Sequence, residues 1–205
     1  MLALIRKSKF IAVLGALAVG AASQAAITFS NVNMVFNPVA TGVGSSFVTG
    51  ATDIDFFTPN FFVGDGAFGP ARVASLTITY EATSDQAMIL DQMILSILGG
   101  VSGSGQIIFS EVIEDMVNPG IIGVLPQTVV NNPNQLPWSA NIVFSRPSTH
   151  IKVKKDFLIA AEPDTQALDF ARVGLIEQNL VVVPEPATLV VAGVGLAAMM
   201  RRRRK

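Results

Sequence analysis

The sequence predicts an all-β fold, a single antiparallel β-sandwich of jelly-roll or immunoglobulin-like type. Apolar and polar residues alternate over short stretches such as 76–80 and 151–154, as they do in strands with one buried face. Stretches that contain Gly, Asn and Pro separate these segments and are typical of turns. Short strands divided in this way favour two packed antiparallel sheets.

Each expected strand has its own supporting pattern. Alternation or β-branched residues predict strands at 27–36, 46–49, 76–80, 106–112, 140–144, 151–154 and 172–182. Gly-, Asn- or Pro-containing stretches predict turns at 42–44, 64–66, 99–100, 118–120 and 131–133. The segment 86–98 also suits a helix, because Met, Ile and Leu recur along it. We favour a strand there.

The N-terminal residues predict a signal peptide at 1–25. Arg6, Lys7 and Lys9 precede an apolar stretch at 10–22, which is the order found in secretory signals. Small residues at Ser23 and Ala25 then predict cleavage by signal peptidase after Ala25. A permanent N-terminal anchor is the alternative, but the apolar core is short for a membrane span. The chain is therefore expected to be exported.

The C-terminal residues 184–205 combine three features of a membrane-sorting segment. Pro184, Glu185 and Pro186 come first, and an apolar run follows at 187–200. As a helix this run would reach roughly 21 Å, against a hydrocarbon core of about 30 Å, so it predicts a short, weak transmembrane helix. A stop-transfer cluster of five cations ends the chain: Arg201, Arg202, Arg203, Arg204 and Lys205. The alternative is a buried core helix, but five adjacent positive charges at its end would not be expected there.

Val183-Pro184-Glu185-Pro186, the apolar run and the basic end together resemble the PEP-CTERM sorting signal of Gram-negative bacteria. The resemblance implies that an integral-membrane exosortase recognises and cuts the chain near this motif. It also implies a precursor tethered to the inner membrane, and then a product at the cell surface or in the extracellular matrix, associated with exopolysaccharide and biofilm. Pro184 and Pro186 keep the backbone extended, as peptidase substrates require.

Three further segments are similar to ectodomains that precede PEP-CTERM signals. They are a Gly-Ser-Gly turn before a strand ending in Glu (103–111), a Val-Lys-Lys-Asp strand (153–156) and an Ile-Glu-Gln stretch (176–178). This resemblance supports the fold and implies no activity. The domain organisation expected is thus a signal peptide at 1–25, a β-sandwich ectodomain at 26–183 and a sorting signal at 184–205.

The ectodomain is acidic and free of cysteine. Residues 26–183 contain six Lys and Arg against 14 Asp and Glu, a net charge of −8. This charge argues against a nucleic-acid-binding surface, which would be basic. The whole chain contains no cysteine, so the fold has no disulfides and no thiolate metal sites. About 158 residues suffice for one domain with a single core.

Catalytic residues are not predicted. His150 is the only histidine, which excludes metal sites that need several imidazoles and leaves one residue for any Ser-His-Asp arrangement. Acidic pairs at 53 and 55, 114 and 115, or 162 and 164 would support glycosidase chemistry only at the right separation. A secreted glycan-active enzyme therefore remains an alternative rather than the first interpretation.

Two binding sites are considered. Asp53 and Asp55 alternate as calcium ligands in loops can, and Asp65 lies in a nearby acidic turn, but no complete EF-hand or nonapeptide repeat is present. Trp138 lies beside a Pro-rich segment and is the residue proposed to bind a ligand by stacking on a sugar. The phenylalanine pairs 56–57 and 61–62 are expected either in the core or in such a site.

The first functional interpretation is a non-catalytic surface or matrix protein that requires no cofactor. Its expected partners are signal peptidase, exosortase, the membrane through the C-terminal helix, and exopolysaccharide. A carbohydrate-binding or adhesive module is the alternative. An ice-binding face is ranked below it, because Thr77 and Thr79 stand alone rather than in a repeated ladder.

Overall fold

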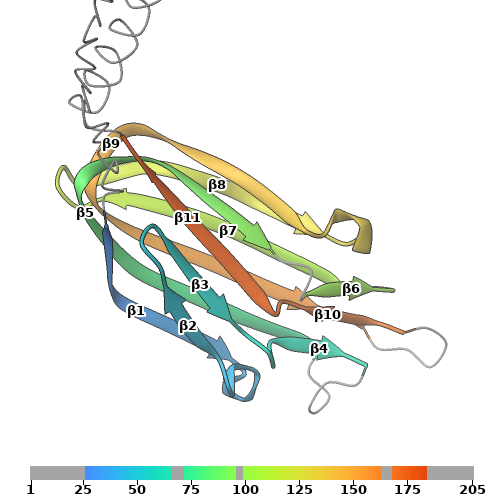
Figure 1. Cartoon of the computed structure of the whole chain (residues 1–205). Helices are drawn as coiled ribbons and strands as arrows, with labels where there is room; N and C mark the ends of the chain where they lie inside the picture. The colour runs from blue at the N-terminus through green and yellow to red at the C-terminus, as the bar shows by residue number, and fades with distance from the viewer. Residues whose placement is uncertain (1–25, 66–71, 96–98, 163–167, 184–205) are drawn as a thin grey trace, which may run out of the picture. The chain divides into compact units, whose positions relative to one another are not determined.

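The computed structural model describes residues 26–65, 72–95, 99–162 and 168–183. Antiparallel strands and short turns form almost all of this part of the chain (Figure 1). The strands are β1 (Ile27–Asn37), β2 (Ser46–Thr49), β3 (Asp53–Phe57), β4 (Phe62–Gly64), β5 (Val73–Leu95), β6 (Gly100–Ser102), β7 (Gln106–Asp115), β8 (Gly120–Val130), β9 (Trp138–Ala160), β10 (Phe170–Arg172) and β11 (Leu175–Val182). Two 3-10 helices lie among these residues, η1 (Val39–Gly42) and η2 (Pro133–Gln135).

Two long strands organise the sheet. β5 and β9 have 23 residues each and pair antiparallel over their whole length, from Val73 opposite Ala160 to Leu95 opposite Trp138. The pairing is irregular between Thr83 and Met88, and both strands curve in this region (Figure 1). Because an irregular register bends a strand, each long strand can contribute its two halves to different layers.

The two halves of β5 and β9 each belong to a separate layer of a sandwich. In the first layer the order is β1, the first half of β5, the second half of β9, β7 and β8. In the second layer the order is β2, β3, β11, the second half of β5 and the first half of β9. Every pairing is antiparallel, and short turns join the consecutive pairs β2–β3 and β7–β8.

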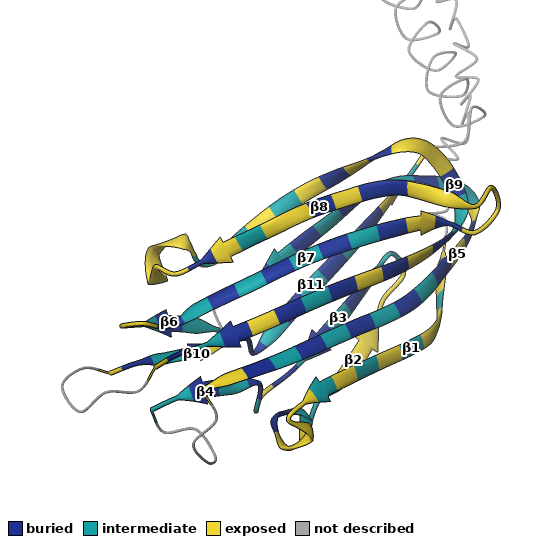
Figure 2. Cartoon of the chain, turned by 180° about the vertical axis from the view of Figure 1, so that it is seen from behind, coloured by how far each residue is buried: buried dark blue, intermediate teal, exposed yellow. Residues whose placement is uncertain are grey.

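The core lies between these layers. Buried and more exposed residues alternate along most strands, as Figure 2 shows, because successive side chains of a strand point to opposite faces. Aromatic rings meet across the gap. Phe56 of β3 lies 5.9 Å from Tyr80 of β5, and Phe109 of β7 meets Trp138 of β9 edge-on at 4.6 Å between ring centroids. These contacts hold the two layers in register with each other.

A small sheet in the order β4, β10, β6 lies at the end of the sandwich away from the bend of β5 and β9 (Figures 1 and 2). Its close packing depends on Gly64, which has φ of +97° and lies opposite Phe170. A Cβ at this position would come within 2.2 Å of the carbonyl oxygen of Asp169. Glycine therefore fits both the backbone conformation and the close approach of β4 to β10.

The prediction of an all-β, antiparallel fold is confirmed. The choice between jelly-roll and immunoglobulin-like topology stays a prediction. The expected signal helix at 1–25 and the transmembrane helix within 184–205 lie outside the described residues. Among the residues that the structure describes, neither helix has the length and hydrophobicity of a membrane span.

The strand predictions are correct for several segments but incomplete. Strands β3, β4, β6 and β8 were not predicted, and the expected strand at 172–182 is two strands, because β10 ends at Arg172 and β11 begins at Leu175. The expected strands at 140–144 and 151–154 are one strand, β9, and 76–80 continues through Leu95 as β5. This extension confirms the strand interpretation of the ambiguous segment as far as residue 95. Pro147 would argue against a continuous β9, but it lies in the irregular region, where a missing backbone N–H is tolerated.

Asp115 fixes the turn between β7 and β8. Its Oδ1 accepts hydrogen bonds from the backbone N–H of Val117 (2.9 Å) and Asn118 (3.1 Å) and from the Ser148 hydroxyl (2.7 Å). Its Oδ2 accepts from Arg146 Nε at 2.9 Å. Burial alone would raise the pKa of Asp115, but the bonds from Arg146, Ser148 and the backbone outweigh it and hold the pKa well below its ordinary value.

Substituting Asp115 by Asn should lower the stability at neutral pH and remove part of its pH dependence. Because the folded pKa lies below the unfolded one, the stabilisation is complete above about pH 4 and is lost as the pH falls through the folded value. Urea unfolding from pH 7 to pH 2 should show a steeper acid decline for the wild type than for D115N. Parallel curves would contradict this role. The exposed Glu114→Gln change serves as the control.

Candidate functional site

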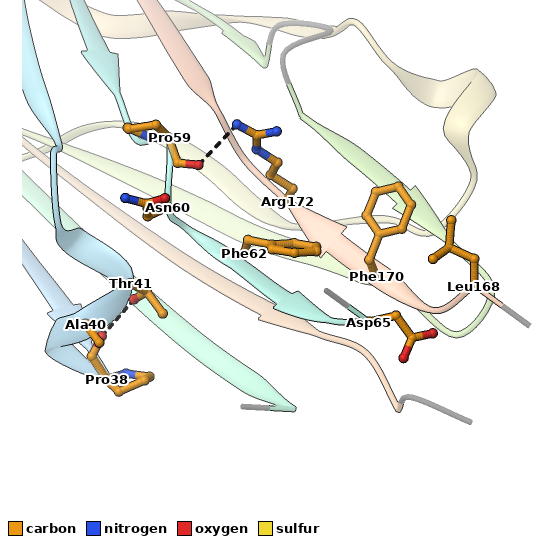
Figure 3. Close-up of a pocket in the computed structure, with 10 residues that line it drawn as sticks. All are labelled: Pro38, Ala40, Thr41, Pro59, Asn60, Phe62, Asp65, Leu168, Phe170 and Arg172. Carbon is orange, nitrogen blue, oxygen red and sulfur yellow. Dashed lines mark hydrogen bonds between the residues drawn. The ribbon is translucent and has the colours of Figure 1, made fainter. Parts of the chain in front are cut away.

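A pocket of about 490 Å³ lies beside the small sheet (Figure 3). Three parts of the chain line it: the end of β1 with η1, the loop from β3 into β4, and the segment around β10. These parts are distant in sequence and meet because β4 pairs with β10. The lining residues are Pro38, Ala40, Thr41, Pro59, Asn60, Phe62, Asp65, Leu168, Phe170 and Arg172.

Two phenylalanine rings form the aromatic part of the pocket. Phe62 of β4 and Phe170 of β10 meet edge to face, with ring centroids 5.9 Å apart and planes at 69°. Phe62 lies directly opposite Arg172 in the β4–β10 pairing. Because residues two apart share a face of a strand, Phe170 and Arg172 both face the pocket (Figure 3).

Polar groups surround these rings and are held by backbone contacts. Arg172 Nη2 donates to the carbonyl of Pro59 at 3.1 Å, and Asn60 Nδ2 donates to the carbonyl of Val43 at 2.7 Å. Asp65 Oδ2 accepts from the backbone N–H of Asp169 at 3.0 Å. The guanidinium, amide and carboxylate are thus oriented before any ligand arrives, and the guanidinium has five N–H donors in total.

This combination of groups suits a polar ligand with apolar faces. Sugars present C–H faces that pack on aromatic rings, and their hydroxyls both donate and accept hydrogen bonds. Phe62 and Phe170 supply the apolar contact, Arg172 supplies donors, and Asp65 supplies an acceptor. The volume is within the range of small-ligand sites, which is about 300 to 1,000 Å³.

Trp138, the residue expected to stack on a sugar, lies at the start of β9 and packs against the core. Its ring meets Phe109 edge-on at 4.6 Å. The structure gives Trp138 a structural contact away from the pocket described above, and its binding role stays a prediction. Of the phenylalanine pairs, Phe56 and Phe61 are fully buried, and Phe62 lines the pocket.

The three calcium candidates are not brought together. Asp53 and Asp55 lie on the outer face of β3, and Asp65 lies after β4 at the pocket. Partial burial, and then the charge of Asp53, raise the pKa of Asp55. In the described part of the chain, no three His, Asp or Glu side chains are close enough to hold a metal ion. Asp53 and Asp55 alternate along the sequence because both lie on the outward face of strand β3.

The groups considered for catalysis have structural contacts. His150 Nε2 lies 3.0 Å from Glu81 Oε2 on neighbouring strands β9 and β5, and Asp115 is bound in the β7–β8 turn. Neither lines the pocket. The sequence analysis placed Arg172 at the start of an expected strand 172–182 and did not reveal the separate three-residue strand β10, which supplies Phe170 and Arg172. A strand that short has too few residues to show an alternating pattern.

Of the predicted sorting residues, only Val183 lies in the described part. Its backbone N–H donates to the carbonyl of Ala87 at 2.8 Å, directly after β11. Ser23, Ala25, Pro184, Glu185, Pro186 and the basic cluster 201–205 lie outside the described residues.

Comparison with known proteins gives one assignment at the C-terminus. Residues 182–205 match the PEP-CTERM protein-sorting motif, so the resemblance of the C-terminal segment is confirmed. No curated protein sequence matches the chain.

Two solved structures show weak overall similarity. One is TmCBM61 in complex with β-1,4-galactotriose, with 12% identity, a TM-score of 0.33, and coverage of 78% of this chain and 90% of that one. The other is the enzymatically active domain of bacteriophage CBA120 tailspike protein 4, with 10% identity and a TM-score of 0.28. This similarity covers 78% of this chain but 20% of the tailspike chain. Resemblances this low carry no information about a ligand.

Replacing Trp138 by Ala should destabilise the fold by about 2 to 4 kcal/mol, because it removes the ring that contacts Phe109 across the core. Phe47 is 45% exposed, so its replacement by Ala is the matched control and should have a much smaller effect. Urea unfolding measures both. Equal losses for W138A and F47A would show that the contact with Phe109 does not stabilise the core.

Proposed function

We propose that this chain, which ends in a PEP-CTERM protein-sorting motif, is an exported surface or matrix protein processed by an exosortase. The match at residues 182–205 carries the proposal. The N-terminal features of a signal peptide fit a product that works outside the cytoplasm, and the net charge of −8 in residues 26–183 favours its solubility. After processing, the released or attached domain is proposed to associate with exopolysaccharide.

The position of the last strand supports cleavage by the exosortase close to the folded domain. Val182 still pairs with Met88, and Val183 donates to Ala87, so the sheet continues up to the first residues of the matched motif. No described linker separates the two. An exosortase that cuts near Pro184 would therefore work within a few residues of the last strand.

Intact mass of the extracellular protein tests the processing. Cells with a functional exosortase should yield a product without the tail, and cells lacking it should retain the full C-terminus. Replacing Pro184, Glu185 and Pro186 together by Ala should give the uncut form in competent cells, because the recognised sequence is gone. Glu177→Ala, which changes a carboxylate of β11 outside the motif, is the control and should be cut normally. Identical masses in both strains would overturn the proposal.

We infer as a second function that the pocket binds a saccharide of the surrounding matrix. The arrangement of Phe62, Phe170, Arg172 and Asp65 favours it, as described above. The position of the pocket also fits. β11 begins near Leu95 and ends near Met88 at the bend, whereas the pocket adjoins the opposite end of the strands. Eight residues of strand span roughly 26 Å, so a chain held by its C-terminus leaves the pocket accessible.

Retention on the polysaccharide of the producing organism tests this function. The full chain should be retained, and Phe170→Ala or Arg172→Gln should lower the affinity about tenfold or more, since each removes a ligand contact. Phe47→Ala, an exposed aromatic outside the pocket, should bind normally. Circular dichroism verifies that each variant folds. Unchanged retention of both pocket variants would contradict the assignment of the pocket. Loss of retention in Trp138→Ala alone would instead support Trp138 as the binding residue.

A further inference from the structure

Three charged side chains are fully buried between the layers of the sandwich. Glu111 on β7 and Lys155 on β9 come from the first layer, and Asp91 on the second half of β5 comes from the facing layer. Each has 0% of its surface exposed. Charged residues are almost never buried this completely unless they are paired, so their presence together calls for an explanation.

The geometry brings Glu111 and Lys155 into contact, and Asp91 lies close enough to both to interact with their charges. Glu111 lies directly opposite Lys155 in the antiparallel β7–β9 pairing, and Lys155 Nζ is 2.5 Å from Glu111 Oε2. Asp91 approaches this pair from the other layer. Burial, and then the charge of Glu111, hold the pKa of Asp91 well above its ordinary value, although Lys155 opposes the shift. A proton on Asp91 removes the repulsion between its carboxyl group and that of Glu111.

The hydrogen-bonding groups of these three side chains are poorly satisfied. The carboxylate oxygens of Asp91 and Glu111, and Lys155 Nζ, have no well-aligned hydrogen bond among the described residues, despite the short ion pair. The hydroxyl of Tyr80 and the amide of Gln178 are buried and likewise unpartnered there. Burying such groups costs several kcal/mol unless the charges are compensated. A reaction that removes charge would relieve this cost.

We propose that Lys155 Nζ and Asp91 Cγ form an intramolecular amide bond in the core, with Glu111 transferring the protons. The three requirements for such a bond are an amine, a carboxylic acid and an adjacent base, all shielded from water. Lys155, Asp91 and Glu111 supply one each. The product joins β5 of the second layer to β9 of the first, so it is a covalent link across the sandwich.

The reaction balances without an external reagent. Glu111 takes a proton from the ammonium of Lys155, and the neutral amine attacks Asp91 Cγ, forming the N–C bond. The Cγ–OH bond then breaks, and the hydroxyl leaves as water with the second proton of the amine, relayed by Glu111. Glu111 ends protonated and Asp91 ends as the amide. An ammonium, a carboxylate and a carboxylic acid thus become an uncharged amide, a carboxylic acid and water, which an apolar core favours.

A cross-link of this kind compensates for the absence of cysteine. An exported protein can be stabilised by a covalent bond that restricts its unfolded chain, and disulfides serve this purpose in other secreted proteins. This chain has no cysteine. A bond between residues 91 and 155 closes a long loop, for which the entropic stabilisation is large.

Mass spectrometry of the full chain tests the proposal. The folded wild type should be lighter by one water molecule than its sequence requires after allowance for terminal processing. A protease digest should contain one branched peptide that joins Lys155 to Asp91. Lys155→Met and Glu111→Gln should each restore the missing water and release the two peptides separately, because they remove the amine and the base.

Lys154→Met is the matched control. Lys154 is the neighbouring lysine, 2.8 Å from Asp156 in a partly exposed ion pair, and its loss should leave the cross-link intact. Recovery of separate Lys155 and Asp91 peptides from folded wild-type protein would overturn the proposal and leave a non-covalent ion cluster. A branch at Glu111 instead of Asp91 would overturn the assignment of roles. Since the wild type alone decides both points, misfolding of a variant does not weaken the test.

Discussion

The architecture depends on the continuous pairing of β5 with β9 across both layers. Two separate sheets would be held together by side-chain packing alone, but here two backbones pass from one layer to the other at the bend. The other strands of the sandwich are added at the edges of this pair. β1 and β11 pair with β5, and β7 pairs with β9. The relative placement of the layers therefore follows from main-chain hydrogen bonds as well as from the core.

The same pairing determines where charge can be buried. Asp91 lies beyond the bend of β5, and Lys155 lies on the part of β9 that pairs with β5 before its bend. Because the strands fold over, inward positions of the two halves face each other across the core. Alternation then places Asp91 opposite the Glu111–Lys155 pair, surrounded by aromatic and aliphatic side chains. The apolar surroundings strengthen the interaction between these groups and also make their separate ionisation costly.

The sequence predicts the scaffold better than the pocket. Strands such as β7 and β11 have enough alternating residues to be located, because one face of each strand is buried. The bend could not be predicted, since it arises from an irregular register in which two expected strands are really one. The pocket could not be predicted either. Phe170 and Arg172 lie on a three-residue strand, and their neighbours come from segments about a hundred residues earlier in the chain.

The buried cluster was within reach of the sequence. If Ile151 and Val153 point inward, then Lys155 must also point inward, and the same alternation from Ile107 and Phe109 places Glu111 in the core. Glu111 and Lys155 lie in two of the three segments that resemble PEP-CTERM ectodomains, and Gln178, another buried polar residue, lies in the third. A charged side chain at an inward position departs from the alternation of apolar and polar residues. Its burial is costly unless an opposite charge or a hydrogen bond compensates for the lost hydration, and apolar packing supplies neither. Such exceptions to strand periodicity identify the inward positions whose burial packing alone does not explain.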